Sequence, residues 1–113
     1  MMYNYQITEY FKKQLKPIVK KDPELKNNLI ETLKNFNKGH SISLGRGIYK
    51  LRLKKKGIGK SGGYRLLILV VEKVGRLAPI YIYDKTNLSN ITVKKMNKHL
   101  QRTKAELSLY ALL

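Results

Sequence analysis

The stretch that decides the fold runs over residues 47–71 and reads GIYKLRL (47–53), KKKGIGKSGG (54–63) and YRLLILVV (64–71). In the first segment apolar and basic residues alternate, so Lys50 and Arg52 lie on one face of a strand and Leu51 on the other. The second segment is too rich in glycine and lysine for regular structure and predicts a loop. The third is almost continuously apolar, which is typical of a central strand. Together they predict an antiparallel hairpin in the middle of a sheet.

Two helices are predicted before this hairpin. Apolar residues at helical spacing indicate a first helix over about 9–20, with Thr8 as its cap. Pro17 should kink or divide that helix. The run Asp22-Pro23-Glu24 has the cap, proline and acid that are typical of a helix start. The helix that it opens should end at Asn37-Lys38-Gly39.

The remainder of the chain predicts a turn at 74–76, a third strand over 78–83 and a last helix from about residue 92 to residue 112. Helices, then strands, then a helix is the order of an α+β protein. We therefore expect one domain over residues 1–113, in which the first two helices pack as a pair on one face of a small antiparallel sheet.

The charge balance is the strongest feature of the composition. The chain holds 24 Lys and Arg against 7 Asp and Glu, a formal net charge of +17. Self-repulsion of this size disfavours a compact domain, so we expect a polyanionic partner. Nucleic acid is the first candidate, because phosphate neutralisation releases counterions and gives affinity without sequence reading. An anionic membrane surface, an acidic protein partner and compositional drift toward lysine are the alternatives.

Several classes of protein are disfavoured by what the composition lacks. There is no cysteine, which excludes disulfides, thiol catalysis and zinc sites built on cysteine. No stretch approaches the ~20 apolar residues that span a bilayer. The N-terminal MMYNYQITEYFKK has no apolar signal core. We expect a cytoplasmic protein with no membrane anchor.

The densest positive charge lies in the hairpin, where residues 46–65 hold eight Lys and Arg and no acid. If the two strands pair, Lys50 and Arg52 lie near Arg65 on one face, where adjacent cations repel each other. A phosphate group between them would satisfy all three. The glycine-rich loop can add backbone amides to such a site. It is a poor match to a nucleotide-binding P-loop, because Lys54 stands where that motif needs glycine.

Tyrosine side chains are interleaved with these cations in the predicted sheet, at positions 49, 64, 81 and 83. This combination suits stacking on unpaired bases, although tyrosine is also a common core residue of strands. Tyr64 and Tyr83 are candidate RNA contacts, and we expect at least two of the four tyrosines to be buried.

The placing of the histidines and acids limits the catalytic mechanisms that the sequence can support. His40 and His99 lie far apart and outside the basic hairpin, so we interpret them as surface residues. The acids are scattered, and neither a metal site nor a cofactor is expected. RNA can instead be attacked by its own 2′-hydroxyl if the protein orients the strand and stabilises the phosphorane charge. Arginine and lysine can do this, and a lysine among other cations can also move protons.

The motifs GIYKLRL (47–53) and GKSGGYRLLI (59–68) resemble the HigB-like branch of the RelE/ParE toxin superfamily, in which they mark the central hairpin. The segment YDKTN (83–87) resembles the family's closing segment, and the resemblance covers roughly residues 25–100. It implies an α+β, RelE-like fold with two N-terminal helices on a small antiparallel sheet and a C-terminal helix. It also implies a metal-independent endoribonuclease that cleaves mRNA in the ribosomal A site and inhibits translation.

The charge pattern and the resemblance together select the site residues. The catalytic candidates are Lys50, Arg52, Arg65 and Lys85, and the RNA-binding candidates are Lys54, Lys60, Tyr64 and Tyr83. The resemblance makes Arg65 the main phosphate-stabilising residue. It places Lys85 where well-known members carry an arginine, and Tyr110 is a candidate for their C-terminal tyrosine. Lys50 and Lys54 are the candidates for the general base.

The implied partners are a cognate antitoxin of the helix-turn-helix, HigA-like kind, the ribosome with its mRNA, and operator DNA through the antitoxin complex alone. Two other functions stay open. The ParE branch of the same fold poisons DNA gyrase without a nuclease site, and a non-enzymatic RNA-binding protein would have a similar composition. The cation-rich hairpin favours the nuclease, since a gyrase poison needs no phosphate-binding constellation. A membrane-surface role would require a basic amphipathic helix, which residues 93–107 form only poorly.

Overall fold

A five-stranded sheet is the middle layer of the structure, a computed structural model that describes residues 3–57, 62–87 and 90–111, with side chains as far as Ser108. The strand order is β1-β5-β4-β3-β2. The strands are β1 (Asn4–Tyr5), β2 (Ile42–Gly45), β3 (Ile48–Leu53), β4 (Tyr64–Val71) and β5 (Arg76–Asp84). β4 is therefore the central strand, as its almost continuously apolar sequence predicts.

The predicted hairpin of β3 and β4 is confirmed. The two strands pair antiparallel from Ile48 opposite Leu69 to Leu53 opposite Tyr64. β4 then turns into β5, its second antiparallel neighbour, through Gly75, which has a φ of 61°. Glycine adopts this left-handed conformation readily because it has no Cβ atom, so the predicted turn is also confirmed.

The prediction of a purely antiparallel sheet is wrong at one edge. β1 runs parallel to β5, with Asn4 opposite Arg76 and Tyr5 opposite Leu77. The sequence does not predict β1, because it has only two residues and its pairing depends on a strand some seventy residues away. The sheet is mixed, within the α+β architecture that the element order predicts.

In the described part of the chain three α-helices accompany the sheet: α1 (Glu9–Lys21), α2 (Glu24–Lys34) and α3 (Val93–Ala111). Thr8 caps α1 as predicted, since its hydroxyl accepts a hydrogen bond from the Phe11 amide at 3.1 Å. Pro17 does not divide α1, which runs unbroken to Lys21. The proline lies on the exposed side of the helix, where water can satisfy the carbonyl group that its ring leaves without a partner.

Asp22 does not cap α2 as the sequence suggests. It is 4% exposed, and its carboxylate accepts hydrogen bonds from the Lys56 amide at 3.0 Å and from the Tyr64 hydroxyl at 3.1 Å. The turn between α1 and α2 is so short that Asp22 also ends α1, with Pro23 as the first residue of the α2 turn. The carboxylate thus ties the helical pair to the loop that follows β3.

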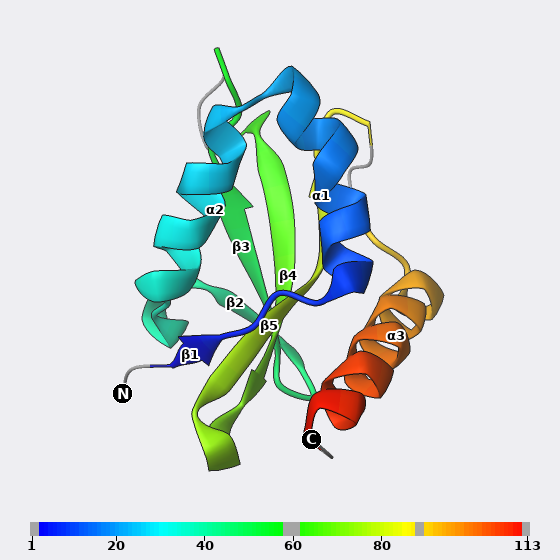
Figure 1. Ribbon diagram of the computed structural model, residues 1–113. Helices are drawn as coiled ribbons and strands as arrows, with labels where there is room; N and C mark the ends of the chain where they lie inside the picture. The colour runs from blue at the N-terminus through cyan, green and yellow to red at the C-terminus, as the bar shows by residue number, and fades with distance from the viewer. Residues whose placement is uncertain (1–2, 58–61, 88–89, 112–113) are drawn as a thin grey trace.

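The helices cover both faces of the sheet, and each interface has its own apolar core. Figure 1 shows α1 and α2 side by side over one face of the sheet, whereas α3 packs on the other face and contacts the first turn of α1 through Glu106 and His99. The core between the sheet and the α1–α2 pair contains Phe11 of α1 and Leu29 of α2, which belong to one apolar cluster with sheet residues such as Leu66. The core under α3 contains Leu100 of α3 and Leu67 of β4. Alternate residues of β4 therefore belong to opposite cores, which explains why its sequence is apolar apart from Arg65.

Among the described residues no helix is both long enough and apolar enough to cross a membrane.

Candidate nucleic-acid interface

A row of three polar side chains crosses the sheet near the end of β3. Arg52 of β3 lies directly opposite Arg65 of β4, and Arg65 lies directly opposite Tyr83 of β5. Lys50 is two residues before Arg52 and belongs to the same face. The structure thus brings Lys50 and Arg52 next to Arg65, the arrangement expected of a paired hairpin. We call the three residues that lie opposite one another on β3, β4 and β5 the Arg52–Arg65–Tyr83 row.

Gly63 holds three strands together beside this row. A Cβ atom on Gly63 would lie 2.2 Å from the carbonyl oxygen of Leu53, so no other residue fits this close approach to β3 without a shift of the backbone. The carbonyl oxygen of Gly63 accepts a hydrogen bond of 3.1 Å from the Lys85 amide. Close packing therefore explains the third glycine of the GKSGGYR motif, and the hydrogen bond to its carbonyl group places Lys85 at the same end of the sheet as Arg65.

The two arginines of the row differ in exposure. Arg52 is exposed, whereas Arg65 is 5% exposed. The Arg65 guanidinium donates a hydrogen bond of 3.3 Å from Nη1 to the Tyr64 carbonyl oxygen, which helps to fix its position. Two cations directly opposite each other in a sheet repel. An anion that reaches both, such as a phosphodiester, would relieve this repulsion and accept several N–H donors.

Acidic side chains compensate only part of the positive charge. Asp84 lies 2.5 Å from the Lys55 ammonium. Burial tends to raise the pKa of Asp84, but hydrogen bonds from Lys55 and Thr86 outweigh it and hold the pKa below its usual value. This pair was not predictable from the sequence, because Lys55 follows β3 whereas Asp84 ends β5, and only the fold brings them together. The following cations near the row form no ion pair within the described part of the chain: Lys50, Arg52, Lys54 and Lys85.

Tyr83 combines a buried ring with an unsatisfied hydroxyl. Its side chain is 5% exposed and stacks on Tyr81, with 5.5 Å between the ring centroids. The hydroxyl is buried and has no hydrogen-bond partner among the described residues. Leaving such a group unpaired costs about 1–3 kcal/mol. The expected base stacking on Tyr83 therefore has little accessible ring surface, and its hydroxyl is equally inaccessible in this conformation.

Tyr64 occupies the opposite face of the sheet from Arg65. Its side chain is 4% exposed, and its ring belongs to the core under α1 and α2. Burial, together with the hydrogen bond to Asp22, raises the pKa of Tyr64 to about 12. This burial argues against the expected RNA contact at Tyr64. With Tyr64 and Tyr83 both buried, the expectation that at least two of the four sheet tyrosines belong to the core is confirmed.

His99, which we interpreted as a surface residue, is partly buried against the sheet. Its ring stacks on Tyr81 with 4.0 Å between the centroids and 14° between the planes. Its Nδ1 atom lies 2.5 Å from the Tyr10 hydroxyl. The interpretation failed because α3 docks through Met96 and Leu100, and this brings His99 onto the sheet as well. Burial first, and then Lys98 and Lys95, lower the pKa of His99.

The docking of α3 should consequently depend on pH. Because the folded state lowers the pKa of His99, its contribution to stability is present above the ordinary value of 6.5 and is lost as the pH falls below it. We expect the stability difference between the wild type and His99→Gln to shrink from about pH 7.5 to about pH 5 in urea unfolding. His40→Gln, at an exposed position, is the matched control. An unchanged difference for His99→Gln would contradict the assignment.

Two of the predicted residues cannot be placed. Lys60 lies outside the described residues, and Tyr110 lies in α3 beyond the last described side chain. Lys54 and Lys85 are both exposed, just after β3 and β5 respectively. No group of three or more histidine, aspartate or glutamate side chains that could hold a metal ion occurs among the described residues.

Comparison with known proteins gives a family match over most of the chain. Residues 8–111 match the family model described as the RelE toxin of the RelE/RelB toxin–antitoxin system. Among solved structures, a double mutant of the E. coli toxin RelE in the free state is similar, with 22% sequence identity and a TM-score of 0.49. The likeness covers 79% of this chain and 90% of that chain. No curated protein matches the sequence at a significant level.

Proposed function

The chain belongs to the RelE family of toxins from toxin–antitoxin systems, and from this premise we propose that it is a ribosome-dependent endoribonuclease that cleaves mRNA and thereby inhibits translation. The observation that carries the proposal is the position of Arg52 directly opposite Arg65. Further cations stand close by without acidic partners among the described residues. Such a site suits the stabilisation of a phosphorane better than the recognition of a protein surface.

In the proposed reaction the RNA supplies its own nucleophile. The 2′-oxygen forms a bond to the adjacent phosphorus as the bond from phosphorus to the 5′-oxygen breaks, which leaves a 2′,3′-cyclic phosphate and a 5′-hydroxyl. Arg65 and Arg52 stabilise the negative charge on the phosphorane. Lys50 or Lys54, in its neutral form, accepts the proton of the 2′-hydroxyl, and a water molecule donates a proton to the departing 5′-oxygen. No step uses a metal ion.

The remaining residues of the site have binding roles in this proposal. Lys85 and Lys60 contact neighbouring phosphates of the strand. Tyr83 contacts the RNA only if its side chain moves on binding, which would let its hydroxyl, buried without a partner among the described residues, donate a hydrogen bond. Tyr64 has no RNA contact here, since its hydroxyl is bonded to Asp22 in the core. Its role is to hold β4 and the loop in place.

The proposed partners follow from the family and from the hairpin motif. A toxin of a toxin–antitoxin pair needs a cognate antitoxin, and the GKSGGYR sequence favours the HigB-like branch, in which a HigA-like, helix-turn-helix antitoxin is expected. Operator DNA would then be bound through the antitoxin in the complex. The ribosome and its mRNA are the targets of the free toxin.

Pulse labelling in cells separates this proposal from a gyrase-poisoning function. After induction of the wild type we expect incorporation of labelled amino acids to stop first, while thymidine incorporation continues, because cleaved mRNA cannot be translated. Arg52→Ala should delay the arrest, since it removes one of the two opposed guanidinium groups. If DNA synthesis stops first, and if Arg52→Ala arrests cells as quickly as the wild type, the chain acts as a gyrase poison instead.

A further inference from the structure

A polar groove runs from the Arg52 end of the site around the edge of the sheet to the N-terminal strand. It consists of three adjoining hollows of about 310, 580 and 710 Å³. The first two share Thr32, Asn35 and Arg52 in their walls. The second and third share the segment 35–37. We call the three together the α2-edge groove.

The groove follows a stretch of β3 that no strand covers in the described part of the chain. β2 pairs with β3 only as far as Lys50, which lies opposite Ile42. Beyond that point Leu51, Arg52 and Leu53 line the groove, with α2 as the opposite wall. Backbone groups along this edge can therefore bind a ligand in addition to the side chains.

The side chains of the groove have the chemistry of a single-stranded RNA site. Four cations line it without an ion pair among the described residues: Lys34, Lys50, Arg52 and Lys54. Two acids also line it, Glu31 in the first hollow and Glu72 in the third, so the cations outnumber them. The carboxylate of Glu72 is engaged by both Lys38 and the Tyr3 hydroxyl, and these contacts lower its pKa despite the opposing effect of burial. The acid of the outer hollow therefore repels an incoming phosphate less than a free carboxylate would.

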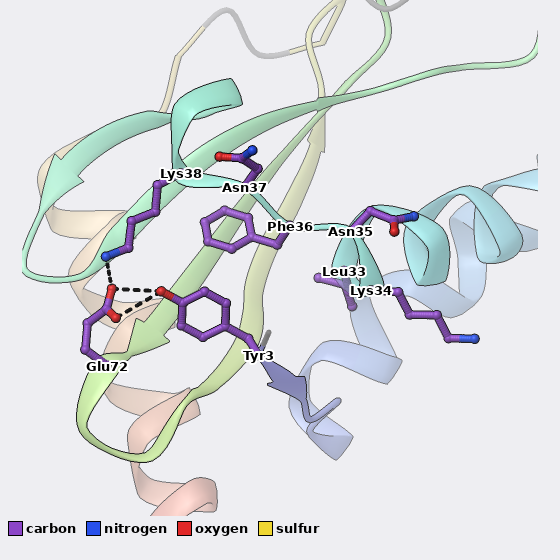
Figure 2. A pocket seen from close by; sticks show the side chains of 8 residues that line it. All are labelled: Tyr3, Leu33, Lys34, Asn35, Phe36, Asn37, Lys38 and Glu72. Atoms are coloured by element: carbon purple, nitrogen blue, oxygen red, sulfur yellow. Dashed lines mark hydrogen bonds and ion pairs between the residues drawn. The ribbon is translucent and has the colours of Figure 1, made fainter. Parts of the chain in front are cut away.

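An aromatic ring lies where the outer two hollows meet. Figure 2 shows Phe36 between Asn35 and Asn37, with the Tyr3 ring beside it. Phe36 is half-buried and is supported edge-on by Tyr3 and Tyr49, at centroid distances of 5.7 and 5.6 Å. A ring held in this way offers a platform for an unpaired base, and the flanking amide groups can bond base edges.

We propose that the α2-edge groove binds the mRNA strand where it continues beyond the bond to be cleaved. Arg52 belongs to both the groove and the Arg52–Arg65–Tyr83 row. An RNA strand bound at the row can therefore continue directly into the groove, which is lined by cations. The inference rests on the proposed function. An extended acidic peptide could also lie along a strand edge, but the aromatic platform at the far end favours a nucleic acid.

The test uses uncleavable oligonucleotides in which every 2′-hydroxyl is replaced by hydrogen, a trinucleotide and a nonanucleotide, with binding followed by fluorescence anisotropy. Lys34→Gln should weaken binding of the nonanucleotide and lower its salt slope by about 0.7, while trinucleotide binding is unchanged. Phe36→Leu should weaken nonanucleotide binding about tenfold through lost stacking, with thermal melting to establish that it is folded. Lys26→Gln is the matched control, because Lys26 is on the same helix but lines the groove between α1 and α2.

Equal nonanucleotide binding by Lys34→Gln and Lys26→Gln would overturn the proposal. So would a loss of ribosome association in Lys34→Gln without any change in oligonucleotide binding, since the groove would then contact ribosomal RNA. Displacement of the nonanucleotide from the groove by a poly-glutamate peptide at equal affinity would assign it to a protein partner. These outcomes leave the nuclease proposal intact when the wild type cleaves mRNA in cells, so the two failures are distinguishable.

Discussion

Replacing Arg65 by alanine should lower the rate of mRNA cleavage on purified ribosomes by about 100- to 1000-fold, the loss expected when one preorganised donor is removed from a developing oxyanion. Arg65 is the buried arginine of the row, and its position is fixed by the strand pairing on both sides. Ribosome binding should be largely retained, because most of the +17 net charge remains. Single-turnover cleavage and ribosome cosedimentation measure the two effects separately.

The control for this prediction is Arg76→Ala, which removes an exposed arginine at the far end of the sheet, in register with Val71. It should cleave at nearly the wild-type rate. Arg65→Gln, which retains hydrogen-bonding capacity in the buried position, guards against a loss of folding and should also be strongly impaired. If Arg65→Gln and Arg65→Ala are folded and cleave normally, the row is not the catalytic site. If both lose ribosome affinity and salt slope, with no cleavage by the wild type, the chain is a non-enzymatic RNA-binding protein.

The second large effect is expected in the core. Leu66→Ala should lower the free energy of unfolding by about 2–5 kcal/mol, because it removes a buried side chain and leaves a cavity. Leu66 is fully buried on the central strand, opposite Leu51 on one side and Ile82 on the other. A domain of this size has only about 5–15 kcal/mol of total stability. Urea unfolding followed by far-ultraviolet circular dichroism measures the change.

Val71→Ala is the matched control for the core, since Val71 ends the same strand and is 36% exposed. Its cost should be well under half that of Leu66→Ala, because the smaller side chain is already partly hydrated. Equal costs for the two substitutions would show that the α1–α2 core is not the main source of stability.

The central hairpin was predictable because its information is local. Alternation over residues 48–53, glycines in the loop and an apolar run in β4 each specify one element, and the strand period of two then dictates that Arg52 and Arg65 share a face. The family match over residues 8–111 agrees with the resemblance carried by this same hairpin.

The parts that sequence reasoning missed depend on contacts between distant segments. β1 forms only because it pairs with β5. The Asp22 side chain does not cap α2, because its carboxylate accepts hydrogen bonds from Tyr64 and Lys56, which are distant in sequence. The ring of Tyr64 faces the core because its neighbour Arg65 faces the other side, a choice that follows from the register and not from residue type. His99 was misread for the same reason, since only the docking of α3 brings it onto Tyr81.

The most direct test of the central claim is primer extension on cellular mRNA after brief induction of the wild type and of Arg65→Ala. The account predicts new 5′ ends inside translated reading frames for the wild type and none for the variant, together with growth arrest for the wild type alone. Growth arrest by the wild type without new 5′ ends would contradict the claim that this protein is an mRNA-cleaving toxin.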